Sequence, residues 1–351
     1  MNAIFNENVP LKTETPAFAK HVLPAVGKIY HDDWMNNGLP DKSVQLIIAD
    51  PPYFEVKGDF DFVWKSFNDY LIDVEKWAIE CKRLLADNGT LFWYGHAKKI
   101  AYAQIIFDKY FNLENNIAIE FNRQTKKGVE NFRCFAPVSE RLLMYSNESE
   151  STNLENALYA ESVKVFTPII EYMKEQKRMI KEYFEMKTDN EFNEYINKLT
   201  NTKSVVSRHY FTYSQWVFPT AEIYAKLQTI NNEVFKKEYE VFKKEYEELR
   251  RPFNNFMKLF DIMSFDQEAH ITRNYDHDTC KPETLTRALI LTCSRPNDLV
   301  LVPFAGSGTE VAMAIKEGRK AIGFDIEEKY VEMGNKRTDN IKAQPSLFAG
   351  S

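Results

Sequence analysis

The most chemically specific segment of the chain is Asp50-Pro51-Pro52-Tyr53, which follows the apolar run Ile47-Ile48-Ala49. That run predicts a buried strand, so the Asp50 carboxylate stands where a strand ends. The two prolines fix their φ angles and hold the loop rigid before a ligand arrives. A carboxylate acceptor beside an aromatic ring suits a flat base that carries an exocyclic amine.

A second segment, Pro303-Phe304-Ala305-Gly306-Ser307-Gly308-Thr309, follows the apolar run 299–302. Gly306 and Gly308 let the backbone approach a ligand closely, and a helix beginning near Thr309 offers free N–H groups to a carboxylate. Open α/β sheets bind ligands at the carboxyl ends of their strands. This loop suits a nucleotide-like cofactor, and the two segments together predict methyl transfer from S-adenosylmethionine to an amino group of a base.

Asp50-Pro51-Pro52-Tyr53 followed by Phe304 to Thr309 resembles the adenine-N6 amino-methyltransferases of DNA. The order of the two segments is that of the permuted beta class of this family, and the resemblance covers roughly residues 28–146 and 268–337. It implies an enzyme that uses S-adenosylmethionine and flips an adenine out of a specific duplex DNA sequence. Asp at the first position favours adenine, since relatives acting on cytosine N4 commonly carry Ser there.

The catalytic problem is that the exocyclic amine of adenine is a poor nucleophile, because its lone pair is delocalised into the ring. We expect the Asp50 carboxylate and the Pro51 carbonyl to accept the two N6 hydrogen bonds and to direct the lone pair at the methyl group. Pro52 helps to fix these acceptors in advance. The Tyr53 ring is expected to stack on the flipped base.

The cofactor residues come partly from the resemblance. Asp325 lies 17 residues after Gly308 at the end of an expected strand, a distance typical for an acid that binds ribose hydroxyls. Asp33 resembles the family's acid near the cofactor adenine, with its neighbour Asp32 left open. Lys281 resembles the helix entry whose backbone meets the methionine end. We expect the cofactor to contact Asp33, Lys281, Pro303, Phe304, Ala305, Gly306, Ser307, Gly308, Thr309 and Asp325.

One departure from the family pattern concerns Val302. Relatives usually have Asp-Pro-Phe before the glycine loop, and that acid is expected to help hold the methionine ammonium group. Here Val302 occupies the position. The change puts cofactor affinity in question, unless Asp50 or another acceptor takes over, or a partner or DNA strengthens binding.

Apolar runs alternate with helical periodicity in both outer parts of the chain, which predicts an α/β fold with a doubly wound, mostly parallel sheet of Rossmann-like methyltransferase type. Gly89 is expected to end the first helix in a left-handed turn. Strands are expected at 28–30, 44–49, 90–94, 116–121, 141–145, 299–302 and 321–324, and helices at 67–85, 97–110, 282–293 and 310–317.

The middle of the chain breaks the alternation, being helix-rich, charged and aromatic. Long helices are expected at 167–184 and 223–248, and the heptapeptide 233–239 repeats exactly as 240–246, which suits a spacer helix. We therefore predict an N-terminal arm at 1–20, a methyltransferase catalytic domain at 21–149 and 266–351, and a helical target-recognition insertion at 150–265.

Within the insertion, residues 188–211 have the outline of a helix-turn-helix, although a plain helical hairpin fits equally well. DNA contacts are expected from its second helix and from a basic run before residue 130. Arg251 is a further candidate for a phosphate contact. The predicted DNA-binding residues are Arg123, Lys126, Lys127, Lys203, Ser207, Arg208 and His209.

The composition is that of a globular protein, with 44% hydrophobic and 27% charged residues and a net charge of −6. There is no 18-residue apolar run, no signal peptide, and no CxxC or clustered histidines, so we expect a cytoplasmic protein with reduced thiols, no metal and no membrane contact. Expected partners are double-stranded DNA, a second copy in a homodimer and a separately encoded restriction endonuclease. Two other hypotheses remain: a non-catalytic DNA-binding subunit, and an RNA adenine-N6 methyltransferase.

Overall fold

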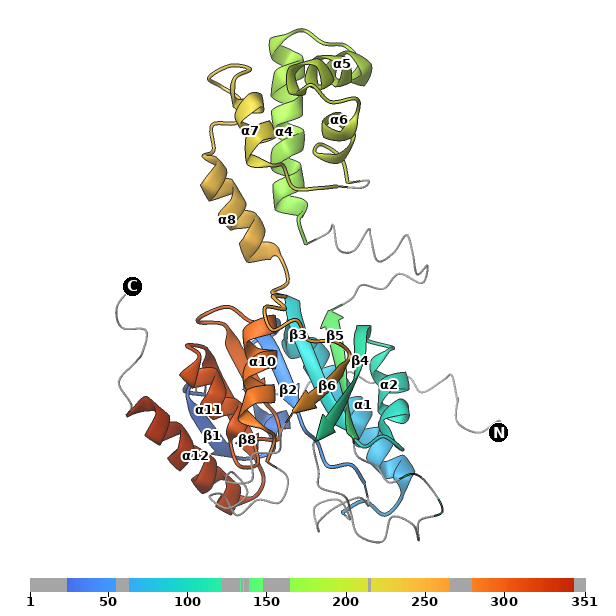
Figure 1. The fold of residues 1–351 in the computed structure, drawn as a ribbon, viewed down its shortest axis with the longest axis vertical. Coiled ribbons are helices and arrows are strands. Elements are labelled where there is room, and N and C mark those ends of the chain that lie inside the picture. Colours follow the sequence, from blue (N-terminus) through green and yellow to red (C-terminus); the bar gives the residue numbers. More distant parts are fainter. Residues whose placement is uncertain are drawn as a thin grey trace.

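The computed structural model describes residues 24–54, 63–121, 133, 135, 139–147, 165–213, 216–265 and 280–343. Its centre is an eight-stranded sheet in the order β1-β8-β7-β2-β3-β5-β4-β6 (Figure 1). β5 runs antiparallel to its neighbours β3 and β4, and the other described pairings are parallel. The predicted α/β class with a mostly parallel sheet is confirmed. The strands are β1 (Lys28–His31), β2 (Val44–Ala49), β3 (Leu85–Gly95), β4 (Phe111–Phe121), β5 (Ser139–Asn147), β6 (Ile262–Phe265), β7 (Leu299–Val302) and β8 (Lys320–Asp325).

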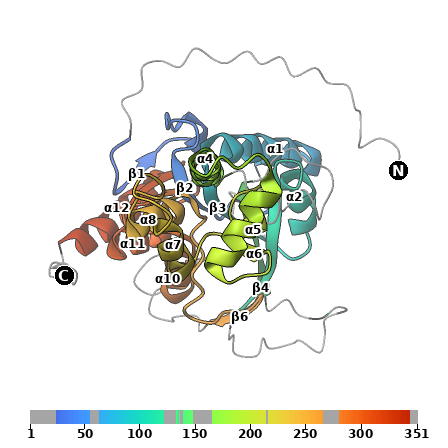
Figure 2. The same ribbon diagram turned by 90° about the horizontal axis from the view of Figure 1, so that it is seen from above.

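Helices cover both faces of the sheet, because successive strand residues point to opposite sides. In β2, Leu46 and Ile48 belong to one apolar core, and Ile47 and Ala49 belong to the other. α10, α11 and α12 pack on the first core, while α1 and α2 pack on the second (Figures 1 and 2). The bounds are α1 (Phe67–Leu84), α2 (Ile100–Phe107), α10 (Glu283–Cys293), α11 (Thr309–Lys316) and α12 (Glu328–Lys342).

The end of α1 differs from the expectation for Gly89. The helix ends at Leu84, and Leu85 is already extended as the first residue of β3. Gly89 lies inside this strand and is not among the glycines with positive φ, so the predicted left-handed turn is wrong. A Cβ at Gly89 would come within 2.6 Å of the Leu85 side chain, which explains the glycine by close approach.

A separate helical unit follows β5. Its helices are α4 (Thr167–Tyr183), α5 (Asp189–Thr200), α6 (Val205–His209), α7 (Ala221–Gln228) and α8 (Tyr239–Leu249). They enclose an apolar core of their own, which is separate from the two cores of the sheet. Among the described residues, no helix has the length and apolar character that crossing a membrane requires.

The predicted end of the insertion at residue 265 needs correction. Residues 262–265 are β6, which pairs in parallel with β4 at the edge of the sheet. The chain has already returned to the catalytic part at Asn254, whose N–H donates to the Thr292 carbonyl at 2.8 Å. This strand was missed because it is only four residues long and Ser264 interrupts its apolar residues.

The predicted long helix 223–248 is wrong, because the first copy of the heptapeptide repeat is a loop. The Asn231 side chain accepts hydrogen bonds from the Glu233 and Val234 N–H groups, as in an Asx turn. Phe235 has φ 50°, and its N–H donates to Gln176 Oε1 of α4 at 2.7 Å. The second copy is helical and buries Phe242 in the same core. Tertiary contacts therefore override the shared local sequence.

The helical unit is attached to the amino-terminal edge of the parallel strands. The antiparallel β5 ends at this edge, and β6 begins there (Figure 1). Asn88, near the start of β3, donates to the Glu248 carbonyl at 3.0 Å, and Arg251 pairs with Glu114 of β4 at 3.3 Å. The carboxyl ends of the parallel strands, where ligands bind in such folds, lie at the opposite edge.

Candidate active site

The two segments that carry the predicted chemistry leave neighbouring strands. β2 and β7 pair in parallel, with Leu46 opposite Val300 and Ile47 opposite Leu301. The Asp50 loop and the Pro303 loop therefore emerge side by side at the carboxyl edge. In the strand order β8-β7-β2-β3, segments from the two ends of the chain meet between β7 and β2. Such a switch point is where open α/β sheets bind ligands.

A cavity of about 400 Å³ lies at this switch point. Its walls come from both loops, from the residues after β1 and β8, and from α1. Of the residues predicted from sequence, the cavity is lined by Asp33, Asp50, Pro51, Pro52, Tyr53, Lys281, Pro303, Phe304, Ala305, Gly306, Ser307 and Asp325. The open alternative, Asp32, also lines it.

Asp50 is the centre of a buried polar cluster. Its Oδ2 lies 3.0 Å from the ammonium nitrogen of Lys281, and its Oδ1 accepts a short hydrogen bond from the Tyr53 hydroxyl. Lys281 also pairs with Glu140 Oε2 of β5 at 2.8 Å and lies 4.5 Å from the Tyr94 ring centroid. Lys281 was predicted to act through its backbone, but its side chain here holds the Asp50 carboxylate in place.

Burial and charge shift the protonation equilibria of this cluster. Burial disfavours the charged form of Lys281, but Asp50 and Glu140 outweigh this effect and raise the lysine pKa. Burial, followed by the charges of Asp50 and Glu140, raises the pKa of Tyr53 well above its usual range. Lys281 is therefore a fixed cation, and the Tyr53 hydroxyl is a fixed proton donor.

The glycine loop has the backbone geometry that its sequence predicts. Gly306 and Gly308 have φ of 48° and 75°, which favours glycine. A Cβ on Gly308 would come within 2.7 Å of Gly334 Cα in α12. Asp325 Oδ2 accepts from the Gly306 N–H at 2.8 Å, so the acid after β8 also holds this loop. Burial raises the pKa of Asp325, against the effect of its two backbone hydrogen bonds.

Gly308 and Thr309 do not line the cavity, although both were predicted to bind the cofactor. Gly308 is the N-cap residue of α11 and makes the close contact with α12. The Thr309 hydroxyl is buried and accepts from Arg337 at 2.7 Å. Arg337 in turn pairs with Glu283 of α10 at 2.6 Å, so Thr309 joins three helices.

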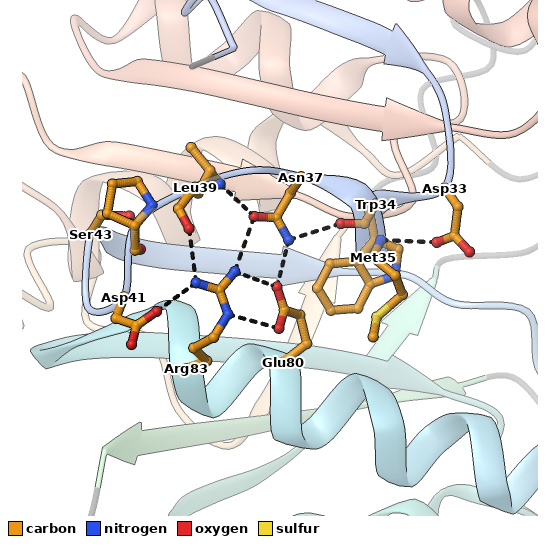
Figure 3. Close-up of polar contacts among 10 residues, drawn as sticks. Asp33, Trp34, Met35, Asn37, Leu39, Asp41, Ser43, Glu80 and Arg83 are labelled. Carbon is orange, nitrogen blue, oxygen red and sulfur yellow. Dashed lines mark hydrogen bonds and ion pairs between the residues drawn. The ribbon is translucent and has the colours of Figure 1, made fainter. Parts of the chain in front are cut away.

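The wall that carries Asp33 is held by a polar network on α1 (Figure 3). Asp33 caps the short helix η1 (Trp34–Asn36) by accepting from the Met35 N–H at 2.9 Å. Asn37 donates to the Trp34 carbonyl and to Glu80 at 3.0 and 2.6 Å, and Glu80 pairs with Arg83. This network fixes the position of Asp33 in the wall of the cavity.

Sequence reasoning missed an aromatic wall. Phe304 packs edge-on against Trp77 of α1 and Trp34 of η1, with ring centroids 5.1 and 6.0 Å apart. Trp64 also lines the cavity. Trp77 falls within the expected helix 67–85, and nothing in its spacing distinguishes a core aromatic from a cavity aromatic. Rings of this kind offer flat apolar surface to a purine.

Four acidic cavity residues were also missed: Asp73, Glu140, Glu310 and Glu327. Glu140 gives no signal in sequence, since it precedes an ordinary apolar strand. Glu310 does give one: it stands in the first turn of a helix whose next four residues are buried. Burial, together with the nearby charge of Asp50, raises the pKa of Glu310 to about 7.

The predicted DNA-binding residues differ in how exposed they are in the structure. Ser207 is buried at 4% exposure, and its hydroxyl donates to Asn197 Oδ1 of α5 at 3.1 Å, so it cannot face DNA as predicted. Lys203 and Arg208 are exposed and His209 is half-buried. Arg251, a candidate phosphate contact, is paired with Glu114. Arg123, Lys126 and Lys127 lie outside the described residues.

The two helices of the proposed helix-turn-helix are present as α5 and α6. Thr188 caps α5 with a capping box, and Asn201 ends it in the left-handed conformation. α6 is only five residues long, which leaves little length for reading a groove. Within the part of the chain that the structure describes, no group of acidic, Cys and His side chains could hold a metal.

Comparison with known proteins places this geometry in a family. Residues 44–336 match the family model N6_N4_Mtase, described as DNA methylase. The DNA adenine methyltransferase YhdJ of Escherichia coli (strain K12) is 24% identical over 86% of this chain and 78% of its own length. The type II methyltransferase M.HinfI of Haemophilus influenzae is 26% identical over 88% of this chain and 66% of its own length.

Solved structures show weaker overall likeness. The M1.HpyAVI–SAM complex aligns over 88% of this chain and 98% of its own, with 17% identity and a TM-score of 0.46. The cytosine-N4-specific PvuII DNA methyltransferase aligns over 90% and 89%, with 13% identity and a TM-score of 0.48. The family assignment depends on the sequence match over 44–336: this chain belongs to the N6_N4_Mtase family of DNA methylases.

Proposed function

We propose that this protein transfers a methyl group from S-adenosylmethionine to the N6 amino group of adenine in a specific duplex DNA sequence. The observation that carries the proposal is the single cavity shared by the Asp50 loop and the glycine loop at the β2–β7 switch point. Adenine is favoured because Asp50 is a carboxylate acceptor, and because relatives such as YhdJ are named DNA adenine methyltransferases.

The cavity residues fit the cofactor. Its aromatic wall suits the adenine ring, and the Asp325 carboxylate at the end of β8 suits the ribose hydroxyls. The backbone of the glycine loop, where Gly306 and Ser307 line the cavity, suits the methionine carboxylate. When bound, the cofactor supplies the methyl group.

Asp50 prepares the target amine. A carboxylate that accepts an N6 hydrogen bond pulls the nitrogen toward a tetrahedral geometry, and it is the acceptor nearest to the proton that the methylated amine must release. Lys281 and Tyr53 currently hold both Asp50 oxygens. Each carboxylate oxygen can accept more than one hydrogen bond, so the N6 group can bind Asp50 beside the Tyr53 hydroxyl or in its place, while Lys281 keeps the carboxylate charged and oriented. Tyr53 lines the cavity, and its ring is available to stack on the base.

The decisive experiment maps N6-methyladenine in DNA from cells that express the protein, by sequencing that detects the modified base. We expect methylation at one short sequence. Asp50→Ala should remove it, while cofactor affinity measured by calorimetry stays within about threefold. Unmodified DNA from cells that contain folded wild-type protein would refute the proposal, as would full methylation by the Asp50→Ala variant.

A non-catalytic DNA-binding subunit is the second candidate, and Val302 is the observation that favours it. Such a subunit would bind DNA without measurable affinity for S-adenosylmethionine. We retain as proposals a homodimer, a separately encoded restriction endonuclease and a cytoplasmic location. An RNA substrate is separated from DNA by assaying both nucleic acids with the purified protein.

A further inference from the structure

Glu310 is the least satisfied charged side chain in the cavity wall. It is 7% exposed and is the second residue of α11. Among the residues that the structure describes, its Oε1 has no hydrogen-bond partner. Burial raises the pKa of Glu310 and outweighs a backbone hydrogen bond and the charges of Lys281 and Arg337, which favour its charged form. A buried carboxylate without an ion-pair partner is unfavourable, so such a group is expected to have one in the working protein.

The other charged groups near Glu310 already have partners. Asp50 and Glu140 share Lys281 at 3.0 and 2.8 Å, and Arg337 is paired with Glu283 at 2.6 Å. No described cation is left for Glu310. Within the described part of the chain this partner is therefore missing, and a positively charged ligand group fits both the buried carboxylate and the cavity that Glu310 lines.

Val302 supplies the second observation. In the family that the sequence resembles, the residue at this position is an acid expected to hold the methionine ammonium group. Here it is an apolar side chain at 1% exposure within the core of the sheet. The acid is absent from the end of β7 but present eight positions later, on the other side of the glycine loop (310 − 302 = 8).

We propose that Glu310 binds the α-ammonium group of the methionine part of S-adenosylmethionine, replacing the acid that Val302 lacks. The inference rests on the proposed function. The ligand's carboxylate and ammonium share one carbon, so a carboxylate held by the glycine loop at Gly306 and Ser307, which line the cavity, leaves the ammonium near the first turn of α11. Glu310 is in that turn.

The pH dependence of binding provides a test without mutation. With a pKa of about 7 in the free protein, Glu310 is largely protonated at pH 6, and binding an ammonium group must displace that proton. We expect S-adenosylhomocysteine to bind roughly tenfold more weakly at pH 6 than at pH 8. An analogue of S-adenosylhomocysteine that lacks the α-amino group should bind with the same affinity at pH 6 and pH 8. The titratable groups that face Glu310 are Asp50, Lys281, Arg337, Tyr94 and Cys280.

The mutational test compares Glu310→Gln with Glu317→Gln by calorimetry. Glu317 follows α11, is similarly buried, and pairs with Arg287 away from the cavity. Glu310→Gln should weaken S-adenosylmethionine and S-adenosylhomocysteine by roughly 10- to 100-fold and leave the analogue without the amine unchanged. Glu317→Gln should bind all three ligands as the wild type does. Glu310→Asp, which keeps the charge, should recover part of the lost affinity.

The outcomes separate this inference from the proposed function. Wild-type protein that binds neither ligand would refute the proposed function itself. Wild-type binding with no loss in Glu310→Gln, or an equal loss for the analogue without the amine, would overturn only the role of Glu310. A loss confined to S-adenosylmethionine would also overturn it, because the carboxylate would then face the sulfonium group. A Glu310→Gln variant that fails to fold leaves the pH measurement on the wild type to decide.

Discussion

At the scale of single residues, the cavity is lined by buried charged side chains that differ in how well their charges are paired. Lys281 balances Asp50 and Glu140, whereas Glu310 remains unbalanced. Ionisable groups whose pKa values are shifted by burial and by neighbouring charges are often found at functional sites. The stability of the ligand-free protein should therefore depend on pH through Glu310.

We predict that Glu310→Gln stabilises the ligand-free protein at pH 8. Burial raises the Glu310 pKa from 4.5 to about 7 in the folded state, so the folded protein holds a proton that the unfolded chain releases. The free energy of unfolding therefore falls by up to about 3 kcal/mol as the pH rises from about 4.5 to about 7. The glutamine variant should lack this loss, and the two proteins should converge toward pH 4. Urea unfolding across the pH range measures the difference.

We expect Asp325 to bind the ribose hydroxyls of the cofactor and also to hold the glycine loop. Its oxygens accept hydrogen bonds from the Gly306 and Glu327 N–H groups. We predict that Asp325→Ala weakens S-adenosylmethionine binding by about 1.5–3 kcal/mol, because ribose hydroxyls and the glycine loop lose a charged acceptor. Asp298→Asn is a useful control, because Asp298 caps a turn at the opposite end of β7. Equal affinities for the wild type and Asp325→Ala would remove this acid from the cofactor site.

At the scale of secondary-structure elements, the fit between α11 and α12 depends on paired glycines. We predict that Gly308→Ala destabilises the fold by more than Gly318→Ala, in chemical unfolding. Both residues have φ near 75°, so both substitutions strain the backbone, by about 1 kcal/mol or more. A Cβ at Gly318 meets nothing within 4 Å, whereas a Cβ at Gly308 meets Gly334 Cα at 2.7 Å. The extra stability lost in Gly308→Ala therefore measures the cost of the contact with Gly334. Equal losses of stability in the two variants would show that only the positive φ matters.

Elements with strong local signals were predictable, and those decided by distant contacts were not. β2 and β7 have the bounds that their apolar runs predict, at 44–49 and 299–302. The antiparallel direction of β5 leaves no trace in its residues. The loop at Phe235 depends on Gln176, a residue in another helix, so the repeat alone could not reveal it. At the site, the motif residues could be found, but Glu140 joins them only through the pairing of distant strands.

At the scale of the whole molecule, the helical unit lies at the amino-terminal edge of the parallel strands (Figure 1). The residues that line the cavity follow the carboxyl ends of these strands, at the opposite edge of the sheet. A six-residue strand such as β2 alone spans about 20 Å. Target recognition by residues 150–265 stays a prediction, but this placement argues against it within one chain. Tyr53 lines the cavity, and Phe121 is the last residue of β4 at the carboxyl edge of the sheet. The segments that follow these two residues in sequence are the alternative candidates for target recognition.

We predict that removing residues 165–249 leaves a folded catalytic unit that methylates the same DNA sequence. The unit has its own core, and residues 148–164 would remain as a linker that reaches about 55 Å when extended. Cofactor affinity should be unchanged, because no cavity residue is removed. Modified-base sequencing of DNA from cells that express the shortened protein gives the answer. A new or lost recognition sequence, with cofactor binding intact, would return target reading to the helical unit.

The heptapeptide repeat has a consequence for deletion variants. Because residues 233–239 and 240–246 are identical, removing either copy yields the same polypeptide. In the full-length protein the two copies have different structures: the first forms a buried turn that places Phe235 against α4, and the second forms the helix that places Phe242 in the core. The deletion variant has one segment for both structures. It can provide only one of the two aromatic side chains. The sequence of the deletion variant does not tell which copy was removed. Its structure would show whether the remaining copy forms the turn or the helix.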